Sequence, residues 1–150
     1  MVGAEMLEQE ITPLAERYGL NVYDIEVVAF GRSLLRVFVE KSGPGVTVGD
    51  LEAFAKVLIP YLNLKGLFPR EGQVEVSSPG LFRKLRRPRH FSAAIGQPIG
   101  VTVTGETGKQ TVKARLIAVT PEGIELENPS LPFVPFDHIL RAQLQPEIRP

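Results

Sequence analysis

The sequence predicts an α+β protein of two small domains, with an N-terminal α/β domain over residues 1–82 and an all-β domain over residues 93–150. Two stretches of the first half repeat apolar residues at three- and four-residue steps, as amphipathic helices do. From residue 99 onward only short stretches typical of strands occur, separated by turn residues. Basic residues gather where the two patterns meet, in an expected junction over residues 83–92.

The first helix is expected over about the first 18 residues. Its buried face consists of Leu7, Ile11, Leu14, Ala15 and Tyr18. Pro13 removes a backbone donor inside this pattern, so the helix either kinks there or restarts with Thr12 as its N-cap. Gly19 stands where a glycine in the left-handed conformation would end the helix.

Strands follow the first helix. The first runs from Val22 to Phe30, with a predicted core face of Tyr23, Ile25, Val27 and Ala29. After a turn at residues 31–33, a second strand has the core residues Leu35, Val37 and Val39. A short third strand covers residues 73–78 and is closed by a turn at Pro79-Gly80.

The second helix lies between the second and third strands. Thr47 and Asp50 have the spacing of a capping box at its start. Its predicted core face is Leu51, Phe54, Ala55, Leu58, Ile59 and Leu62. Pro60 should bend the last turn or shorten it. The N-terminal domain is therefore expected to place two helices on one face of a small three-stranded sheet.

The second half begins with one short helical turn at Phe91, Ala94 and Ile95. Five strands are expected after it, over residues 99–104, 111–120, 123–127, 133–136 and 141–144. Residues 137–140 form a tight turn before the last strand. Five short strands in so few residues favour a small closed barrel.

The charges are segregated although the formal net charge is zero. Residues 1–82 hold 7 basic and 11 acidic residues, residues 83–115 hold 8 and 1, and residues 116–150 hold 2 and 5. The centre of this cationic band is a run made of Arg83, Lys84, Arg86, Arg87 and Arg89. A polyanion such as nucleic acid would neutralise this run, whereas a solvated charged linker is the ordinary interpretation of a charge run alone.

Two features favour nucleic acid. Phe82, Leu85 and Phe91 place apolar anchors among the cations, and arginine, which suits bidentate phosphate contacts, predominates. Lys113 and Arg115 lie two residues apart on a predicted strand and could extend the basic surface, although an ordinary solvated strand face explains them equally well.

Other chemistry has little support. The chain has no cysteine, and its two histidines lack the spacing of a metal site. No motif of a nucleophilic serine surrounds Ser77 or Ser78. The stretch from Gly105 to Lys109 departs from a P-loop and from a KH-type GXXG clamp, so a hairpin turn is the better interpretation. We therefore expect no enzyme, no cofactor and no metal. With neither a signal sequence nor an apolar span, a cytoplasmic protein without membrane contact is expected.

The run Val74-Glu75-Val76-Ser77-Ser78-Pro79-Gly80-Leu81, followed by Arg83 and Leu85, resembles the signature of the bacterial ribosome maturation factor RimP family. Further similar blocks follow in order, among them residues 18–20, 35–39, 45–50, 90–96 and 134–144. Phe82 and Lys84 stand where the family usually has Asp and Pro. The two serines have a second interpretation, in which they cap backbone groups at a strand end.

The resemblance implies an SH3-like (Sm-like) barrel for the C-terminal domain. It also implies a non-catalytic factor that binds the free immature small ribosomal subunit, supports the maturation of its rRNA and contacts the twelfth small-subunit ribosomal protein. A monomer without a small-molecule substrate is expected. The alternative is a general single-stranded RNA-binding module that acts through the barrel.

Overall fold

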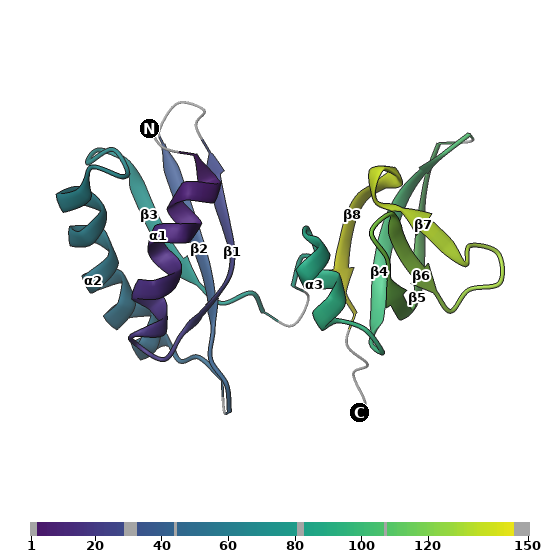
Figure 1. The fold of residues 1–150 in the computed structure, drawn as a ribbon, viewed down its shortest axis with the longest axis horizontal. Coiled ribbons are helices and arrows are strands. Elements are labelled where there is room, and N and C mark those ends of the chain that lie inside the picture. Colours follow the sequence, from purple (N-terminus) through teal and green to yellow (C-terminus); the bar gives the residue numbers. More distant parts are fainter. Residues whose placement is uncertain (1–2, 29–32, 44, 81–82, 107, 146–150) are drawn as a thin grey trace. The chain divides into compact units, whose positions relative to one another are not determined.

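A computed structural model describes residues 3–28, 33–43, 45–80, 83–106 and 108–145 of the chain. The chain forms two compact units, Met1–Pro79 and Gly80–Pro150, each with its own sheet (Figure 1). The first contains α1 (Ala4–Glu16), β1 (Asn21–Val28), β2 (Leu34–Glu40), α2 (Val48–Lys65) and β3 (Gln73–Ser77). The second contains α3 (Pro88–Ala93), β4 (Pro98–Gly105), β5 (Gly108–Val119), β6 (Gly123–Leu126), β7 (Phe133–Pro135), the 3₁₀ turn η1 (Phe136–His138) and β8 (Ile139–Leu144). The predicted α+β class is confirmed.

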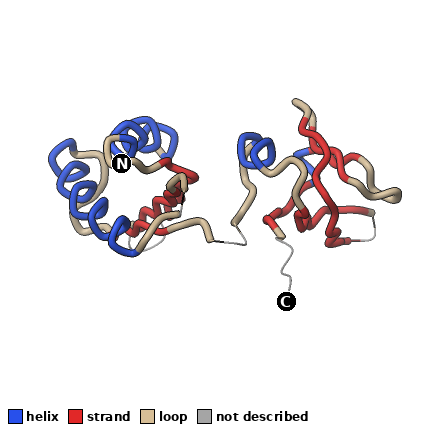
Figure 2. The backbone as a smooth tube through the Cα atoms, turned by 90° about the horizontal axis from the view of Figure 1, so that it is seen from below, coloured by secondary structure: helices blue, strands red, loops and turns tan. Residues whose placement is uncertain are grey.

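The first unit is a three-stranded sheet with two helices on one side. The strand order is β1-β2-β3, with β1 antiparallel and β3 parallel to the central strand β2. Figure 2 shows α1 and α2 on the same side of the sheet, as predicted. One core joins the helices to the sheet, and its fully buried side chains include Leu7, Ile11, Leu35, Val37, Phe54 and Leu58.

The first helix runs through its proline without restarting. Thr12 is inside α1, where its hydroxyl donates to the carbonyl of Glu8 at 2.7 Å, so the prediction of a Thr12 N-cap is wrong. Gly19 has a φ of +74°, and the glycine end of the helix is confirmed. Tyr18 was expected on the buried face but is 49% exposed, because the helix has ended before it.

The second helix begins as predicted and continues past Pro60. The Thr47 hydroxyl accepts the Asp50 N–H at 3.1 Å and the Asp50 carboxylate accepts the Thr47 N–H at 2.9 Å, which confirms the capping box. Pro60 does not shorten α2, which continues to Lys65. Pro60 lies on the exposed side, where water can bind the carbonyl that loses its partner. Ile59, expected in the core, is 39% exposed.

One polar residue of the first sheet is buried against expectation. Asp24 is 3% exposed, although the alternation along β1 places it on the polar face. The pairing of β1 with β2 shifts register between Val22 and Asp24, as at a β-bulge. The carboxylate accepts the N–H of Ile25 at 2.9 Å, which satisfies part of its hydrogen-bonding capacity. Ala29 and the turn at residues 31–32 lie outside the described residues.

The second unit is a single five-stranded antiparallel sheet in the order β7-β6-β5-β4-β8. All five predicted strands are confirmed, and Gly105 pairs with Gly108 at the predicted hairpin. The long strand β5 has a register shift between Leu116 and Ala118, so its two halves pair with different neighbours. The first strand of this unit lies between the last and the second, and η1 precedes the last strand, which is the order of an SH3-like barrel. Its core contains Ile99, Val101, Leu116, Ile124, Leu126 and Val134.

Candidate nucleic-acid interface

The basic segment, defined here as residues 83–89, is attached to one edge of the second sheet. The N–H of Leu85 donates to the carbonyl of Ala142 at 2.9 Å, and the N–H of Leu144 donates to the carbonyl of Arg83 at 2.9 Å. Lys84 forms an isolated antiparallel bridge with Gln143 between these bonds. The backbone of the segment therefore continues the sheet beyond β8.

Buried side chains fix the same segment from within. Leu85 and Phe91 are each 3% exposed and belong to the core of the second unit. His90 is also 3% exposed, and its Nδ1 atom accepts the N–H of Arg86 at 3.0 Å and that of Arg87 at 3.2 Å. An Nδ1 atom that accepts hydrogen bonds carries no proton, so the ring holds its proton on Nε2. The sequence suggested a separate junction over residues 83–92, whereas these side chains pack with the second unit.

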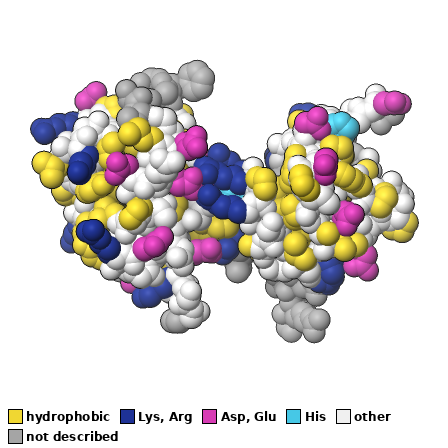
Figure 3. All heavy atoms as spheres, viewed as in Figure 1, with side chains coloured by type: hydrophobic (Ala, Val, Ile, Leu, Met, Phe, Trp, Pro, Cys, Tyr) yellow, Lys and Arg dark blue, Asp and Glu magenta, His cyan; other side chains and the backbone are white. Residues whose placement is uncertain are grey.

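The cations of the basic segment gather at the surface beside α3, where Figure 3 shows a cluster of Lys and Arg side chains. Lys84, Arg86 and Arg89 are exposed, and Arg83 and Arg87 are partly buried. Each of these five residues has at least one further polar or electrostatic interaction within the chain. The surface is therefore strongly positive, although its members are not isolated charges.

A groove of about 910 Å³ opens on the second unit. Its lining consists of Lys84, Leu85, Arg86, Pro88, Phe91, Gly100, Thr102, Thr111, Lys113, Phe136, Ile139, Leu140, Arg141, Ala142, Gln143 and Gln145. Four of these residues are cationic, and the described lining contains neither Asp nor Glu. A concave surface lined by one sign of charge concentrates the electric field and attracts anions.

The pairing of strands brings the residues of the groove together. Gly100 of β4 is opposite Lys113 of β5 on one side and Gln143 of β8 on the other. Two residues along β4, Thr102 is opposite Arg141 of β8. Because residues two apart on a strand share a face, these side chains lie on the same face of the sheet. Lys113 and Arg141 are far apart in sequence, but they lie on the two strands that flank β4.

The groove includes some of the predicted site residues and leaves out others. Lys84, Arg86 and Lys113 line it, whereas Arg83, Arg87, Arg89 and Arg115 do not. The guanidinium of Arg115 donates to the carbonyl of Gly96 and lies 3.8 Å from a carboxylate oxygen of Glu127. Arg115 therefore contacts its own unit.

Arg141 is the groove cation that sequence reasoning missed. It is exposed on β8, beside the buried Ala142, as the alternation of a strand requires. That alternation predicts an outward side chain but not the neighbouring strand. Neither Lys113 nor Arg141 forms an ion pair with another residue in the described ranges.

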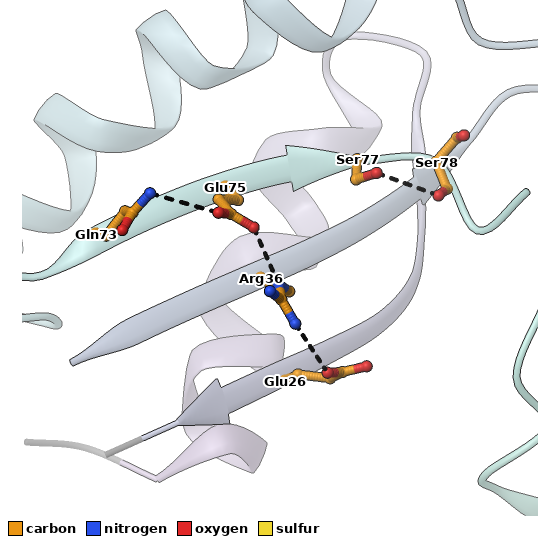
Figure 4. A network of polar contacts seen from close by, with 6 residues as sticks. All are labelled: Glu26, Arg36, Gln73, Glu75, Ser77 and Ser78. Carbon is orange, nitrogen blue, oxygen red and sulfur yellow. Dashed lines mark hydrogen bonds and ion pairs between the residues drawn. The ribbon is translucent and has the colours of Figure 1, made fainter. Parts of the chain in front are cut away.

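The Ser77-Ser78 block lies at the end of β3, in the first unit (Figure 4). The hydroxyl of Ser77 donates to the carbonyl of Ser78 at 3.3 Å, in agreement with the interpretation of Ser77 as a partner of a backbone group. On the neighbouring strands, the guanidinium of Arg36 lies 2.9 Å from Glu75 and 4.0 Å from Glu26. This ion-pair row crosses all three strands and neutralises part of the polar face.

Other kinds of site receive no support from the described ranges. No three His, Asp or Glu side chains among them lie close enough to hold a metal ion. His138 is exposed, with its Nε2 atom 4.0 Å from the carboxylate of Asp137. No helix in the described part of the chain is long and apolar enough to cross a membrane.

The comparison with protein families matches residues 10–82 to the RimP N-terminal domain. The matched range takes in the second half of α1 and all of β1, β2, α2 and β3, and it contains the signature run from Val74 to Leu81. The resemblance found in the sequence is confirmed over this range. Residues 10–82 are thus a RimP N-terminal domain, which supports membership of the RimP family of ribosome maturation factors.

Proposed function

We propose that this protein is a non-catalytic assembly factor that binds the free immature small ribosomal subunit and supports the maturation of its rRNA. The observation that carries the proposal is the basic segment, whose five cations stand on a backbone fixed to the edge of the second sheet. The RimP N-terminal domain on the same chain gives this positive surface its ribosomal context. Docking of the protein on the subunit requires no covalent step.

Fixing the backbone of the segment favours binding. Long cationic side chains lose conformational entropy when they contact phosphates, and a disordered linker would lose backbone entropy as well. Here Leu85 and His90 have already fixed the backbone through core packing and hydrogen bonds. The arginines supply affinity through phosphate contacts, and the shape of the assembled particle supplies specificity, because phosphate contacts carry little sequence information.

The proposal includes a protein partner. Family membership supports contact with the twelfth small-subunit ribosomal protein, with the RimP factor acting as a monomer on the particle. A composite surface of rRNA and protein would bind the assembled subunit more tightly than bare rRNA. This difference separates an assembly factor from a general RNA-binding module.

A general single-stranded RNA-binding module needs exposed aromatic rings on which bases stack. Among the described residues of the second unit, only Phe133 is an exposed large aromatic, at 38%, and it does not line the groove. Phe91 is buried and packs against Phe136 with ring centroids 5.8 Å apart. This unit therefore offers little surface for base stacking.

The test is co-sedimentation of the full chain with immature small subunits, mature small subunits and bare rRNA at moderate salt. The variant replaces Arg83, Arg86 and Arg87 with alanine. We expect it to bind the immature subunit at least about tenfold more weakly, a difference of about 1.4 kcal/mol. The control replaces three exposed cations of the first unit, Lys56, Lys65 and Arg70, and has the same net charge.

Unchanged affinity of the arginine variant, with its fold intact by circular dichroism, would remove the proposed role of the segment. An equal loss of affinity in the control variant would show that binding depends on net charge and not on the basic segment. Equal affinity of the native chain for bare rRNA and for the immature subunit would favour the general RNA-binding module instead.

A further inference from the structure

A row of paired residues on neighbouring strands crosses the groove. Lys113, Gly100 and Gln143 are opposite one another on β5, β4 and β8, and Gln143 is in turn bridged to Lys84. Neighbouring strands are about 4.8 Å apart, so the backbones of Lys113 and Lys84 are about 14 Å apart across the sheet. The row thus has a lysine at each end, with Gly100 and Gln143 between the two lysines.

The glycine makes the row hollow. No side chain rises from Gly100, and a Cβ atom added there would meet the side chain of Gln145 at 3.3 Å. On the opposite face of β4, Ile99 and Val101 are fully buried in the core, which holds the strand in place. The strand that forms the floor of this hollow is therefore packed against the core, and the amide side chain of Gln145 lies over it.

A second row adds hydroxyl groups and another cation. Thr102 is opposite Thr111 and Arg141, and the hydroxyl oxygens of the two threonines are 3.0 Å apart. Four neutral hydrogen-bonding side chains therefore stand among the four cations of the groove, namely Thr102, Thr111, Gln143 and Gln145. This mixture suits a partner that has regularly spaced negative charges separated by hydroxyl groups.

We propose that the groove binds the sugar-phosphate backbone of one unpaired RNA strand, with Lys113 and Arg141 as phosphate-binding residues. The inference rests on the proposed function and names the class of RNA that the second unit takes. Phosphates would contact the cations, and 2′-hydroxyls would contact the threonine and glutamine side chains. The two aromatic rings that line the groove are buried (Phe91) and partly buried (Phe136), so binding would rest on the RNA backbone and would tolerate many base sequences.

The concave shape favours a single strand over a duplex. A single strand can lie in the groove and reach Lys84 on one side and Lys113 on the other. A duplex presents a wide convex surface and would contact only side chains on the rim. The apolar part of the lining, which includes the exposed Leu140, would contact ribose or base carbons that a duplex hides.

The experiment uses the full chain and fluorescently labelled oligouridine, with a hairpin duplex of equal length and poly-glutamate as competitors. We expect K113Q and R141Q each to weaken oligouridine binding by about fivefold to tenfold at low salt. Each variant should also lower the slope of log K against log salt concentration by about 0.7, the value for one lost single-strand phosphate contact. A substitution that acts only through structure would leave this slope unchanged.

K109Q is the matched control, since Lys109 is on the same strand as Lys113, is exposed and does not line the groove. Amide NMR shifts of Gly100 and Thr102 on titration with oligouridine would locate the strand. The inference is overturned if K109Q matches K113Q, if the duplex competes as well as the single strand, or if poly-glutamate competes better than either.

The outcomes also separate this inference from the proposed function. Suppose that oligouridine does not bind, but that the variant of Arg83, Arg86 and Arg87 binds the immature subunit more weakly than the native chain. The groove proposal is then wrong and the docking proposal is supported. If the native chain binds oligouridine but no form of the small subunit, the docking proposal falls.

Discussion

The Nδ1 atom of the buried His90 accepts the backbone N–H of Arg86 at 3.0 Å, and the same atom accepts that of Arg87. A single imidazole thus fixes the backbone of two cations of the basic segment. The ring lies in the interior of the second unit, whereas Arg86 is exposed and Arg87 is partly buried. This contact joins the stability of the second unit to the geometry of its positive surface.

Replacing His90 with phenylalanine should therefore destabilise the second unit. Phenylalanine fills a similar volume but leaves two N–H groups without their side-chain acceptor, which we expect to cost about 1–3 kcal/mol. Urea denaturation, followed by NMR signals of the second unit, measures the change. His138→Phe is the control because His138 is exposed. Equal stability of the two variants would show that the His90 contacts contribute nothing.

The anchoring of Leu85 leads to a second prediction. Leu85 is 3% exposed, so Leu85→Ala removes buried methyl groups and should cost about 2–5 kcal/mol. Leu64 is 84% exposed, and Leu64→Ala should change stability by less than about 0.5 kcal/mol. Chemical denaturation of both variants tests the pair. A loss below about 1 kcal/mol for Leu85→Ala would mean that the segment is not part of the packed unit.

Sequence patterns predicted the elements of this fold because each of those patterns is local. The capping box at Thr47 and Asp50 located the start of α2, and alternating polarity located all five strands of the second unit. The burial of Asp24 could not be predicted, because it depends on a register shift between two strands. That α2 continues past Pro60 could not be predicted either, because it depends on Pro60 lying on the side of the helix that is exposed to water.

The candidate site was predictable only in part, for a related reason. The run of cations is visible in the sequence, and Lys113 was recognised from its strand. The sequence does not show that β4 lies between β5 and β8, and only that order places Arg141 across from Thr102 and near Lys113. The hollow at Gly100 likewise becomes visible only when its strand neighbours are known.

The capping box of α2 gives a prediction of pH dependence. The N–H of Thr47, with its hydroxyl and Lys41 as smaller influences, holds the pKa of Asp50 below its ordinary value of 3.8. The unfolded chain then binds this proton more readily than the folded one, so the contribution to stability is present above pH 3.8 and is lost as pH falls through the lowered pKa. Asp50→Asn should remove that part of the acid sensitivity.

Thermal unfolding between pH 2 and 7 measures the effect, with Glu71→Gln, at an exposed turn, as the control. The native chain should be more stable than Asp50→Asn at neutral pH, and the difference should shrink as the pH falls below about 4. A difference that stays constant over the whole range would contradict the role of the charged carboxylate.

The close approach of β6 and β7 at Gly123 gives the last prediction. The φ angle of Gly123 is not positive, so its backbone would accept alanine, but an added Cβ would collide with the carbonyl oxygen of Val134 and lie 2.8 Å from the Cα of Pro135. Both obstacles are backbone atoms that a rotamer change cannot move. Gly123→Ala should therefore separate the two strands and cost at least about 2 kcal/mol. Gly105→Ala is the control, since its nearest contact would be an ordinary 3.6 Å. Ile124 and Val134 are opposite each other on these strands, and hydrogen exchange at their amides should accelerate in Gly123→Ala but not in Gly105→Ala. Unchanged protection of these two amides in Gly123→Ala would show that the strands accommodate the added methyl group without separating.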